Sequence, residues 1–317
     1  MLTGLLTTAG QVATLFLMMA IGFALRKWRK LSDDGISPMT FLLLYVVAPC
    51  LIVRSMQIER SAEALQSMLF SALGCVIYYV VGIVGGLPLF SKRAPDTRDV
   101  LRFGSVYSNN GFMGFPLVLA LLGDGAGICA AAFLIVNSIV QWTHGVALMT
   151  PKNADAATGS RVTNLRRVVL NPGTIAFAIG AVLYGFGLRL PQQVGNAVGF
   201  MADVNTPLAM VIIGAQMADA DILSLFRHIE LYALAALKLL IFPAIAAAIL
   251  HLFSPPPLVY CATVILAATP SAGMTSMFAQ RFGRDTATAA RAVTFTTLLS
   301  ILTLPVFASV AMRVSGL

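Results

Sequence analysis

Long apolar runs separated by short polar segments dominate the chain. Five of them approach or exceed the roughly 20 residues that a helix needs to cross a bilayer core: residues 5–25, 41–56, 68–89, 126–149 and 259–278. The whole pattern predicts ten membrane-spanning helices, at residues 5–25, 36–56, 67–89, 100–122, 126–148, 169–188, 194–217, 230–252, 258–280 and 286–312. The predicted fold class is an all-α polytopic membrane protein.

Two of the predicted spans, the fourth and the ninth, are interrupted by polar and helix-breaking residues. The interruptions are residues 108–116, Ser-Asn-Asn-Gly running to Pro, and residues 269–273, Thr-Pro-Ser-Ala-Gly. Backbone polar groups inside a bilayer must be satisfied by the protein, so a break at this depth is tolerated only where it packs in protein or lines a wet cavity. Broken helices at matching places in two repeats indicate the substrate site of a secondary transporter.

The landmarks of the two halves pair at an offset of about 160 residues, Pro49 with Pro207 and Pro116 with Pro270. Five spans per repeat would make the second copy inverted relative to the first, as in many carriers. We therefore expect a first five-helix repeat at residues 1–149, a short cytoplasmic linker at 150–168 and a second repeat at 169–317. Coincidental spacing of the prolines is the alternative.

Composition and charge support a membrane protein. The chain is 58% hydrophobic and 11% charged, against about a quarter charged in soluble domains. The net charge of +8 comes from basic residues dispersed between spans, which does not favour nucleic-acid binding.

With both termini outside, the inner loops hold most of the basic residues, as the positive-inside rule requires. The inner residues are Arg26, Lys27, Arg29, Lys30, Lys92, Arg93, Arg98, Arg102, Lys152, Arg161, Arg166, Arg167, Arg227, Arg281, Arg284 and Arg291; the outer ones are Arg54, Arg60, Arg189 and Arg313. The start of the chain lacks a basic region and a cleavage site, so we expect a retained first span.

Catalytic motifs are missing from the sequence. It contains no GxSG, HExxH or Walker A pattern, and the cysteines, Cys50, Cys75, Cys129 and Cys261, lie in apolar spans without CxxC spacing. We expect neither an enzyme nor a metal site, and no cofactor, with coupling to H⁺ or Na⁺ left open.

The two interruptions carry the candidate binding chemistry. A broken helix exposes amides with partial positive charge at the start of its second half, where an anion can dock. The candidate binding residues there supply side-chain donors, hydroxyls, flexible backbone and fixed bends: Asn109, Asn110, Gly111, Pro116, Thr269, Pro270, Ser271 and Gly273. The alternative is that these side chains only cap the broken helices.

Further polar residues lie inside predicted spans. Lys238, in span eight, is a candidate for charge support because an uncompensated buried charge costs about 3 kcal/mol or more; snorkelling to the interface is its alternative. Asn137 and Gln141 share a helix face in span five and face either the cavity or a neighbouring helix. The remaining polar residues are Gln216, a pathway candidate, His144 and His251, expected at interfaces, and Asp203, a proton or sodium site or a solvated carboxylate.

Three stretches resemble the auxin efflux carrier family in its short bacterial form, over essentially the whole chain. They are residues 104–116 (GSVYSNNGFMGFP), Asn171-Pro172, and residues 267–273 (AATPSAG) followed by Phe278-Ala279. The resemblance implies ten spans in two inverted repeats, crossing broken helices at spans four and nine, and a transport domain that moves against a scaffold of spans one, two, six and seven.

The resemblance also implies a site and a substrate class. Asn110 and Pro116, with Pro270 and its neighbours, would form the crossover that holds the substrate carboxylate. Plant members of the family move indole acetate, and dicarboxylates such as malate or malonate are attributed to bacterial ones. This chain lacks the long central loop of the plant carriers and has no acidic residue at positions 74–86, which argues against a proton-linked site in span three.

The predicted function is secondary transport of small carboxylates by alternating access, in the inner membrane of a bacterium. The expected partners are a small organic anion, the lipid bilayer and, through the scaffold helices, a second copy of the chain. Two alternatives stay open: a membrane sensor that binds a carboxylate without net flux, and a carrier for aromatic monocarboxylates.

Overall fold

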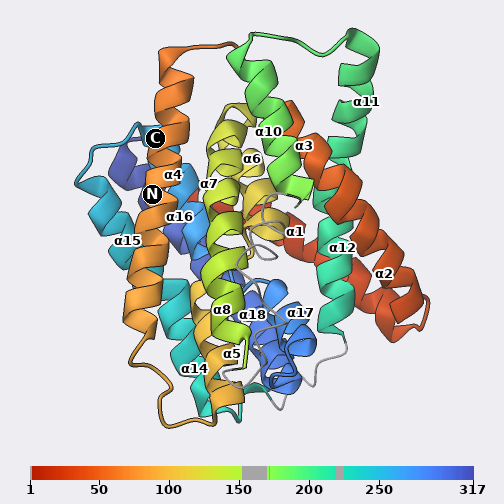
Figure 1. The fold of residues 1–317 in the computed structure, drawn as a ribbon, viewed down its shortest axis with the longest axis vertical. Helices are drawn as coiled ribbons and strands as arrows, with labels where there is room; N and C mark the ends of the chain where they lie inside the picture. Colours follow the sequence, from red (N-terminus) through yellow and green to blue (C-terminus); the bar gives the residue numbers. More distant parts are fainter. Residues whose placement is uncertain (1, 152–169, 171, 219–224) are drawn as a thin grey trace.

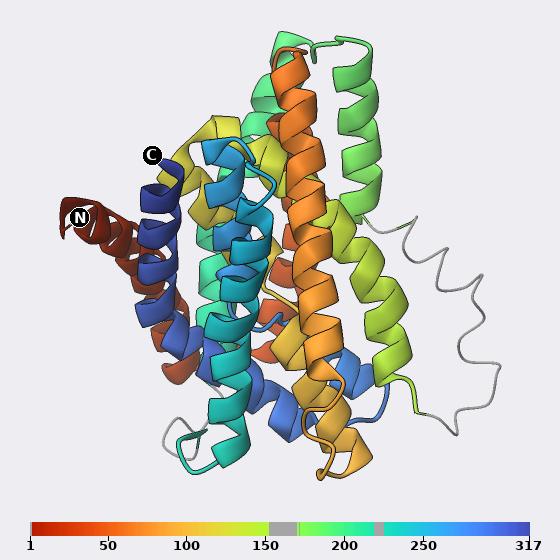
Figure 2. The ribbon, with the colours of Figure 1, turned by 90° about the vertical axis from the view of Figure 1, so that its left-hand side faces the viewer.

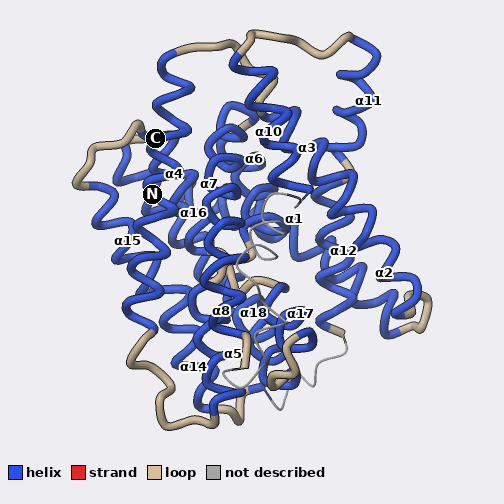
Figure 3. Tube along the Cα trace, viewed as in Figure 1, coloured by secondary structure: helices blue, strands red, loops and turns tan. Residues whose placement is uncertain are grey.

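The computed structural model describes residues 2–151, 170, 172–218 and 225–317 (Figure 1). In these ranges the structure is helical, without a strand longer than a single bridge (Figure 3). The α-helices are α1 Leu2–Lys27, α2 Asp33–Leu42, α3 Ala48–Ser55, α4 Ala62–Gly86, α5 Pro95–Val106, α6 Phe115–Leu122, α7 Gly127–Val140, α8 Val146–Met149, α10 Pro172–Gly185, α11 Gln192–Asp203, α12 Asn205–Met217, α14 Ile229–Ala236, α15 Phe242–His251, α16 Pro257–Ala268, α17 Met274–Arg281 and α18 Thr286–Ser315. Apart from Thr150 and Pro151, the predicted linker at 150–168 lies outside the described residues, as does Asn171.

Seven of the described helical stretches are long and apolar enough to cross a membrane. They are Ala9–Lys27, Asp33–Ser55, Ala62–Gly86, Asp124–Met149, Gln192–Met217, Ile229–His251 and Thr286–Ser315, and three shorter apolar helices are Asn110–Leu122, Pro172–Gly185 and Pro257–Ala268. Large apolar side chains such as Phe186 and Phe200 are exposed, as expected of a surface that faces lipid tails. The all-helical polytopic membrane fold predicted from the sequence fits this structure.

Several of the long stretches contain a turn of π-helix. Three of these turns, η1 Leu43–Val47, η2 Asn110–Gly114 and η6 Leu237–Ile241, end two residues before a proline, at Pro49, Pro116 and Pro243. Proline has no N–H to donate to the carbonyl four residues earlier, and in each case that carbonyl lies in the π turn. The proline therefore accounts for the local change of helix type, which is frequent at functional sites.

The described helices pack in two groups, seen from perpendicular directions in Figures 1 and 2. In the first group α1 lies along α12, and α3 packs against α10 and α11. In the second group α4 packs against α7 and α15, and α16 packs against α18 and α4. The groups meet where α1 lies against α18, where η2 contacts α12, and where α7 packs against α3 and α10. The broken helices belong to the second group.

Two glycines allow the close crossing of α1 and α12. A Cβ atom on Gly22 would overlap the carbonyl oxygen of Val211, and one on Gly214 would overlap the carbonyl oxygen of Met19. Small residues permit this backbone approach, which is how helices associate where lipid removes the hydrophobic driving force. This contact holds α1 closely against α12 within the first group.

Candidate functional site

Both predicted interruptions are present in the structure, and they pair with each other. Helix α5 ends at Val106 and η2 begins at Asn110, while α16 ends at Ala268 and α17 begins at Met274. The backbone N–H of Asn109 donates to the Pro270 carbonyl at 2.8 Å, and the backbone N–H of Ala272 donates to the Tyr107 carbonyl at 2.9 Å. An antiparallel bridge joins Ser108 to Ser271. Each break thus satisfies backbone groups of the other, as burial in a membrane protein requires.

Two of the predicted hydroxyls are occupied with capping. Thr269 Oγ1 donates to the Leu266 carbonyl at 2.8 Å, and Ser271 Oγ donates to the Gly104 carbonyl at 2.6 Å. Leu266 and Gly104 lie in the last turns of α16 and α5, where helical carbonyls lack intrahelical partners. The capping alternative therefore describes the hydroxyls of Thr269 and Ser271 in this conformation.

The side-chain nitrogen of Asn110 is a hydrogen-bond donor without a partner among the described residues. The side chain is 1% exposed, and its Nδ2 atom makes no hydrogen bond to any described residue. The Tyr79 hydroxyl lies beside this side chain but in a geometry that leaves Nδ2 unpaired. A buried unsatisfied donor costs about 1–3 kcal/mol, so its presence calls for a partner such as a bound acceptor.

The first turn of η2, which begins at Asn110, adds backbone donors beside that side chain. The first four N–H groups of a helix have no intrahelical acceptor and carry partial positive charge. Asn109, directly before η2, is buried and has its own amide committed to Pro270. What remains available at the break is the Asn110 side chain and the helix start that follows it.

A buried chain of hydrogen-bonded polar side chains runs from Tyr79 into α7 and η4. The Tyr79 hydroxyl donates to Asn137 Oδ1, and Asn137 Nδ2 donates to Gln141 Oε1 at 3.5 Å. Asn137 and Gln141 lie on one helix face, as their spacing predicts, and hydrogen-bond within the protein. Tyr79, on α4, connects this pair to the first break through its ring, whose centroid lies 5.4 Å from that of Tyr107.

Lys238 lies at the pair of breaks and is completely buried. Its Nζ donates to Ser108 Oγ at 2.7 Å, to the Tyr78 hydroxyl at 2.8 Å and to the Ala267 carbonyl at 3.0 Å. The snorkelling alternative is wrong for this structure, because the ammonium reaches the break instead of the interface.

The prolines and glycines of the breaks have unequal roles. Pro116 and Pro270 are buried, and the Pro270 carbonyl takes part in the pairing. A Cβ on Gly273 would meet nothing within 4 Å, and one on Gly111 would meet only Leu134 at 3.8 Å, so packing does not require glycine at either position. The glycine that packing does require is Gly114, where a Cβ would lie 2.9 Å from Leu266 Cδ2 and 3.0 Å from Thr269 Cγ2.

Other polar candidates lie away from the breaks. Asp203 is 64% exposed at its side chain and pairs with Arg54 at 2.5 Å, so it is a solvated carboxylate in an ion pair. Gln216 is exposed, and the His251 ring packs edge-on against Tyr260. All four cysteines are free.

Two contacts at the break were missed from the sequence. His144 Nδ1 lies 2.8 Å from the Tyr107 hydroxyl, so this histidine contacts the residue that begins the first break. Thr296 Oγ1 accepts a hydrogen bond of 3.1 Å from the Ser271 amide. Four polar residues of this region lie in π-helical turns: Asn110, Gln141, His144 and Lys238. In the sequence, a proline two residues after the turn indicates two of these three turns, η2 and η6.

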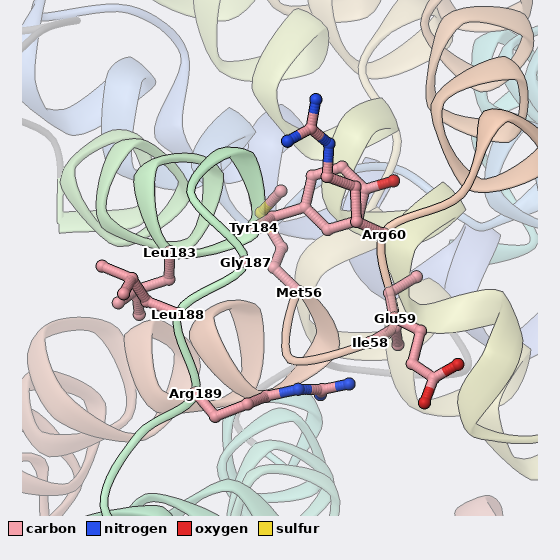
Figure 4. A pocket seen from close by; sticks show the side chains of 9 residues that line it. All are labelled: Met56, Ile58, Glu59, Arg60, Leu183, Tyr184, Gly187, Leu188 and Arg189. Atoms are coloured by element: carbon pink, nitrogen blue, oxygen red, sulfur yellow. The ribbon is translucent and has the colours of Figure 1, made fainter.

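A separate cavity of about 380 Å³ lies between the loop that follows α3 and the loop that follows α10 (Figure 4). Arg60 and Arg189 line it, but their guanidinium groups donate to the carbonyls of Gly185 and Gln57. It contains none of the candidate site residues.

The helices, the lipid-facing apolar surface and the paired breaks define a polytopic membrane transporter. The chain belongs to the membrane transport protein family, whose sequence profile matches residues 7–308. This match confirms the resemblance to auxin efflux carriers drawn from the sequence. The family is described as one of membrane transport proteins, and the relatives below are named transporters.

Individual relatives cover the same length. A Methanothermobacter thermautotrophicus protein named an uncharacterized transporter is 23% identical over 94% of this chain and 97% of its own. A Rhizobium meliloti protein provisionally named a malonate transporter is 23% identical over 93% of this chain and 92% of its own. A third, an uncharacterized transporter of Methanocaldococcus jannaschii, is 21% identical over 92% of this chain and 94% of its own.

Proposed function

We propose that this transporter is a secondary carrier for small carboxylates, which it binds at the paired breaks and moves by alternating access. The observation that carries the proposal is the buried Asn110 amide, which has an unused donor at the start of a broken helix. A carboxylate oxygen is an acceptor that would satisfy that donor and the adjacent backbone amides together. Asn110 is the principal contact, with Asn109 and the turn around Gly111 and Gly273 shaping the site.

The electrostatics of the breaks favour an anion. Lys238 brings a basic side chain to the same place, and none of the described acids forms a salt bridge with it. In its protonated form this side chain favours a carboxylate over a cationic substrate, because a carboxylate offsets its charge. Dicarboxylates such as malonate and malate are the first candidates, since a relative is provisionally named for malonate transport.

The closed state of the site suits alternating access. With Asn110 at 1% exposure, an anion reaches it only when the helix groups shift. We propose that the group containing the breaks moves against α1, α2, α3, α10, α11 and α12, with the latter group also forming a homodimer.

The ten-span topology belongs to the same proposal. In it, the three shorter apolar helices complete spans four, six and nine, and residues 1–149 and 169–317 form inverted repeats. We propose that both termini lie outside an inner membrane, because most of the basic residues between spans then lie on the inner side. A cysteine introduced at Lys92 and, in a second variant, one introduced at Glu59 test this orientation. A reagent that does not cross the membrane should label the first from the inside only and the second from the outside only.

Flux in proteoliposomes tests the function. Purified protein should take up labelled malonate or malate in a saturable way that unlabelled carboxylate competes, and Asn110→Ala should lower uptake at least tenfold, the equivalent of about 1.4 kcal/mol. Saturable uptake of indole acetate in place of dicarboxylates would favour an aromatic substrate. Binding of a carboxylate without any flux would instead favour a sensor.

A further inference from the structure

The contacts of Lys238 form a small cage of oxygen atoms. Tyr78 comes from α4, Ser108 from the first break and Ala267 from the last turn of α16, and all three oxygens lie 2.7–3.0 Å from Nζ. No carboxylate of the described residues takes part.

The hydrogen-bond directions in this cage match an ammonium. The Tyr78 hydroxyl donates its hydrogen to the Val106 carbonyl at 2.8 Å, and the Ala267 carbonyl has none, so both oxygens can only accept from Nζ. Ser108 Oγ has acceptors of its own in Tyr78 and Ala267, at 3.1 and 3.3 Å. The three N–H groups of a charged lysine satisfy all three oxygens at once.

Two helix ends add to the negative potential around Nζ. Ala267 lies in the last turn of α16, and Val106, the acceptor for Tyr78, is the last residue of α5. The carbonyl end of a helix carries partial negative charge and favours a cation. The paired breaks bring the ends of α5 and α16 to the same lysine.

Several titratable groups on the elements packed against Lys238 have other partners. Those with assigned partners are Cys75 with the Phe133 carbonyl, Tyr79 with Asn137, Asp99 with Arg98 and Arg284, Arg102 with the Leu87 and Leu89 carbonyls, Glu230 with Arg93, and Cys261 with Ser315. The oxygen cage thus has the ligands of a cation site, and the group that occupies it is the Lys238 side chain of the protein itself.

We propose that the Lys238 ammonium is a built-in cation that takes the place of a coupling ion, so that the carrier binds its anion without a bound Na⁺ or a proton taken up with the anion. The anion part rests on the proposed function; the ammonium and the filled cage do not. A monovalent cation would seek the same kind of oxygen ligands, and here Nζ already occupies them.

The first test is the charge of Lys238 in the wild-type protein without any anion. Nitrogen-15 NMR of lysine-labelled protein, with the Lys238 signal assigned from its loss in Lys238→Arg, should show three attached hydrogens at pH 6 and at pH 8. A signal with two attached hydrogens would overturn the proposal. This outcome does not depend on whether any carboxylate binds, so it separates the proposal from the proposed function.

The second test is ion dependence. Malonate should raise the unfolding temperature of the wild-type protein with the same half-saturating concentration, within about twofold, in sodium chloride and in choline chloride. In Lys238→Ala the effect of malonate should vanish in choline chloride and return in part with sodium or methylammonium chloride, whereas the exposed-lysine control Lys92→Ala should match wild type. A tenfold dependence of wild type on sodium would overturn the built-in cation, as would full malonate binding by Lys238→Ala in choline. If wild type binds no carboxylate in either salt, the proposed function fails, and the NMR result alone decides the charge of Lys238.

Discussion

The amide nitrogen of Asn109 lies 2.8 Å from the carbonyl oxygen of Pro270 and joins the break in one half of the chain to the break in the other. With the reciprocal bond from Ala272 to Tyr107 at 2.9 Å, it makes the two interruptions one structural unit. A helix broken alone at this depth would leave backbone groups unsatisfied at several kcal/mol each. Each break is stable because the other is present.

The fit of the two breaks depends on Gly114. In Gly114→Ala the new methyl group would press on Leu266 and Thr269 at 2.9 and 3.0 Å, so we expect a loss of about 1–3 kcal/mol of stability from overpacking. Gly273→Ala is the matched control, because its Cβ would meet nothing within 4 Å. Thermal unfolding in detergent measures both. Equal stability of the two variants would contradict the packing described for the breaks.

The hydroxyl of Tyr78 holds the Lys238 cage to α5. Tyr78→Phe removes the acceptor for Nζ and the donor to the Val106 carbonyl, and we expect it to lower stability by about 1–3 kcal/mol. Tyr260→Phe should change stability by less than about 0.5 kcal/mol, because its hydroxyl has no hydrogen bond among those found for the described residues. If Tyr78→Phe unfolds at the wild-type temperature, the cage contributes nothing to the fold.

The crossing of α1 and α12 requires glycine at position 22. Gly22→Ala places a methyl group against the Val211 carbonyl, which side-chain rotation cannot relieve, so we expect a loss of about 3 kcal/mol or more. Gly10→Ala, on the same helix with open space around its Cβ, should be neutral or stabilising by up to about 1 kcal/mol. The amount of folded protein after purification and its unfolding temperature distinguish the two. Wild-type values for Gly22→Ala would mean that the helices cross elsewhere.

Asp285 makes the start of α18 sensitive to acid. Burial alone would raise the pKa of this carboxyl, but hydrogen bonds from Thr288 and Thr97 and the charge of Arg291 outweigh burial and lower the pKa. A carboxyl with a lowered pKa stabilises the folded state at pH values above its unfolded pKa, and this contribution is lost as the pH falls through its folded pKa.

Unfolding of Asp285→Ala across pH 3 to 7 measures that contribution. At pH 7 the variant should be about 1 kcal/mol less stable than wild type, as for loss of a helix N-cap, and the difference should shrink on acidification. Thr97→Val, which removes one of the donors, should show a smaller change of the same sign. A difference that stays constant with pH would contradict the role of the ionised carboxyl.

Much of this arrangement could be predicted from the sequence because membrane burial simplifies the pattern. Apolar runs located the long helices, and the residues at 108–116 and 269–273 located both breaks, since few residues besides proline, glycine and asparagine interrupt a helix in lipid. The i, i+4 spacing correctly placed Asn137 and Gln141 on one face.

What the sequence could not give is which partner each polar group selects. The position of Lys238 along its span allows either snorkelling or inward burial. The oxygens of Tyr78, Ser108 and Ala267, which other segments supply, decide between the two. The hydroxyls of Thr269 and Ser271 could bind a ligand as far as their chemistry goes, but in this structure they cap helix ends. Tyr79 and His144 join the site through contacts between spans, which a pattern along one span does not contain.

The central claim is that the free Asn110 amide binds a carboxylate, and a ligand titration of two variants tests it most directly. The control, Asn205→Ala, removes another buried amide, on α12, that also lacks partners among the described residues. We predict that malonate or another carboxylate raises the unfolding temperature of wild type and Asn205→Ala alike, and that Asn110→Ala, itself folded, needs about 10- to 100-fold more ligand because one hydrogen bond to a charged group is lost. Equal half-saturating concentrations in wild type and Asn110→Ala would contradict the account.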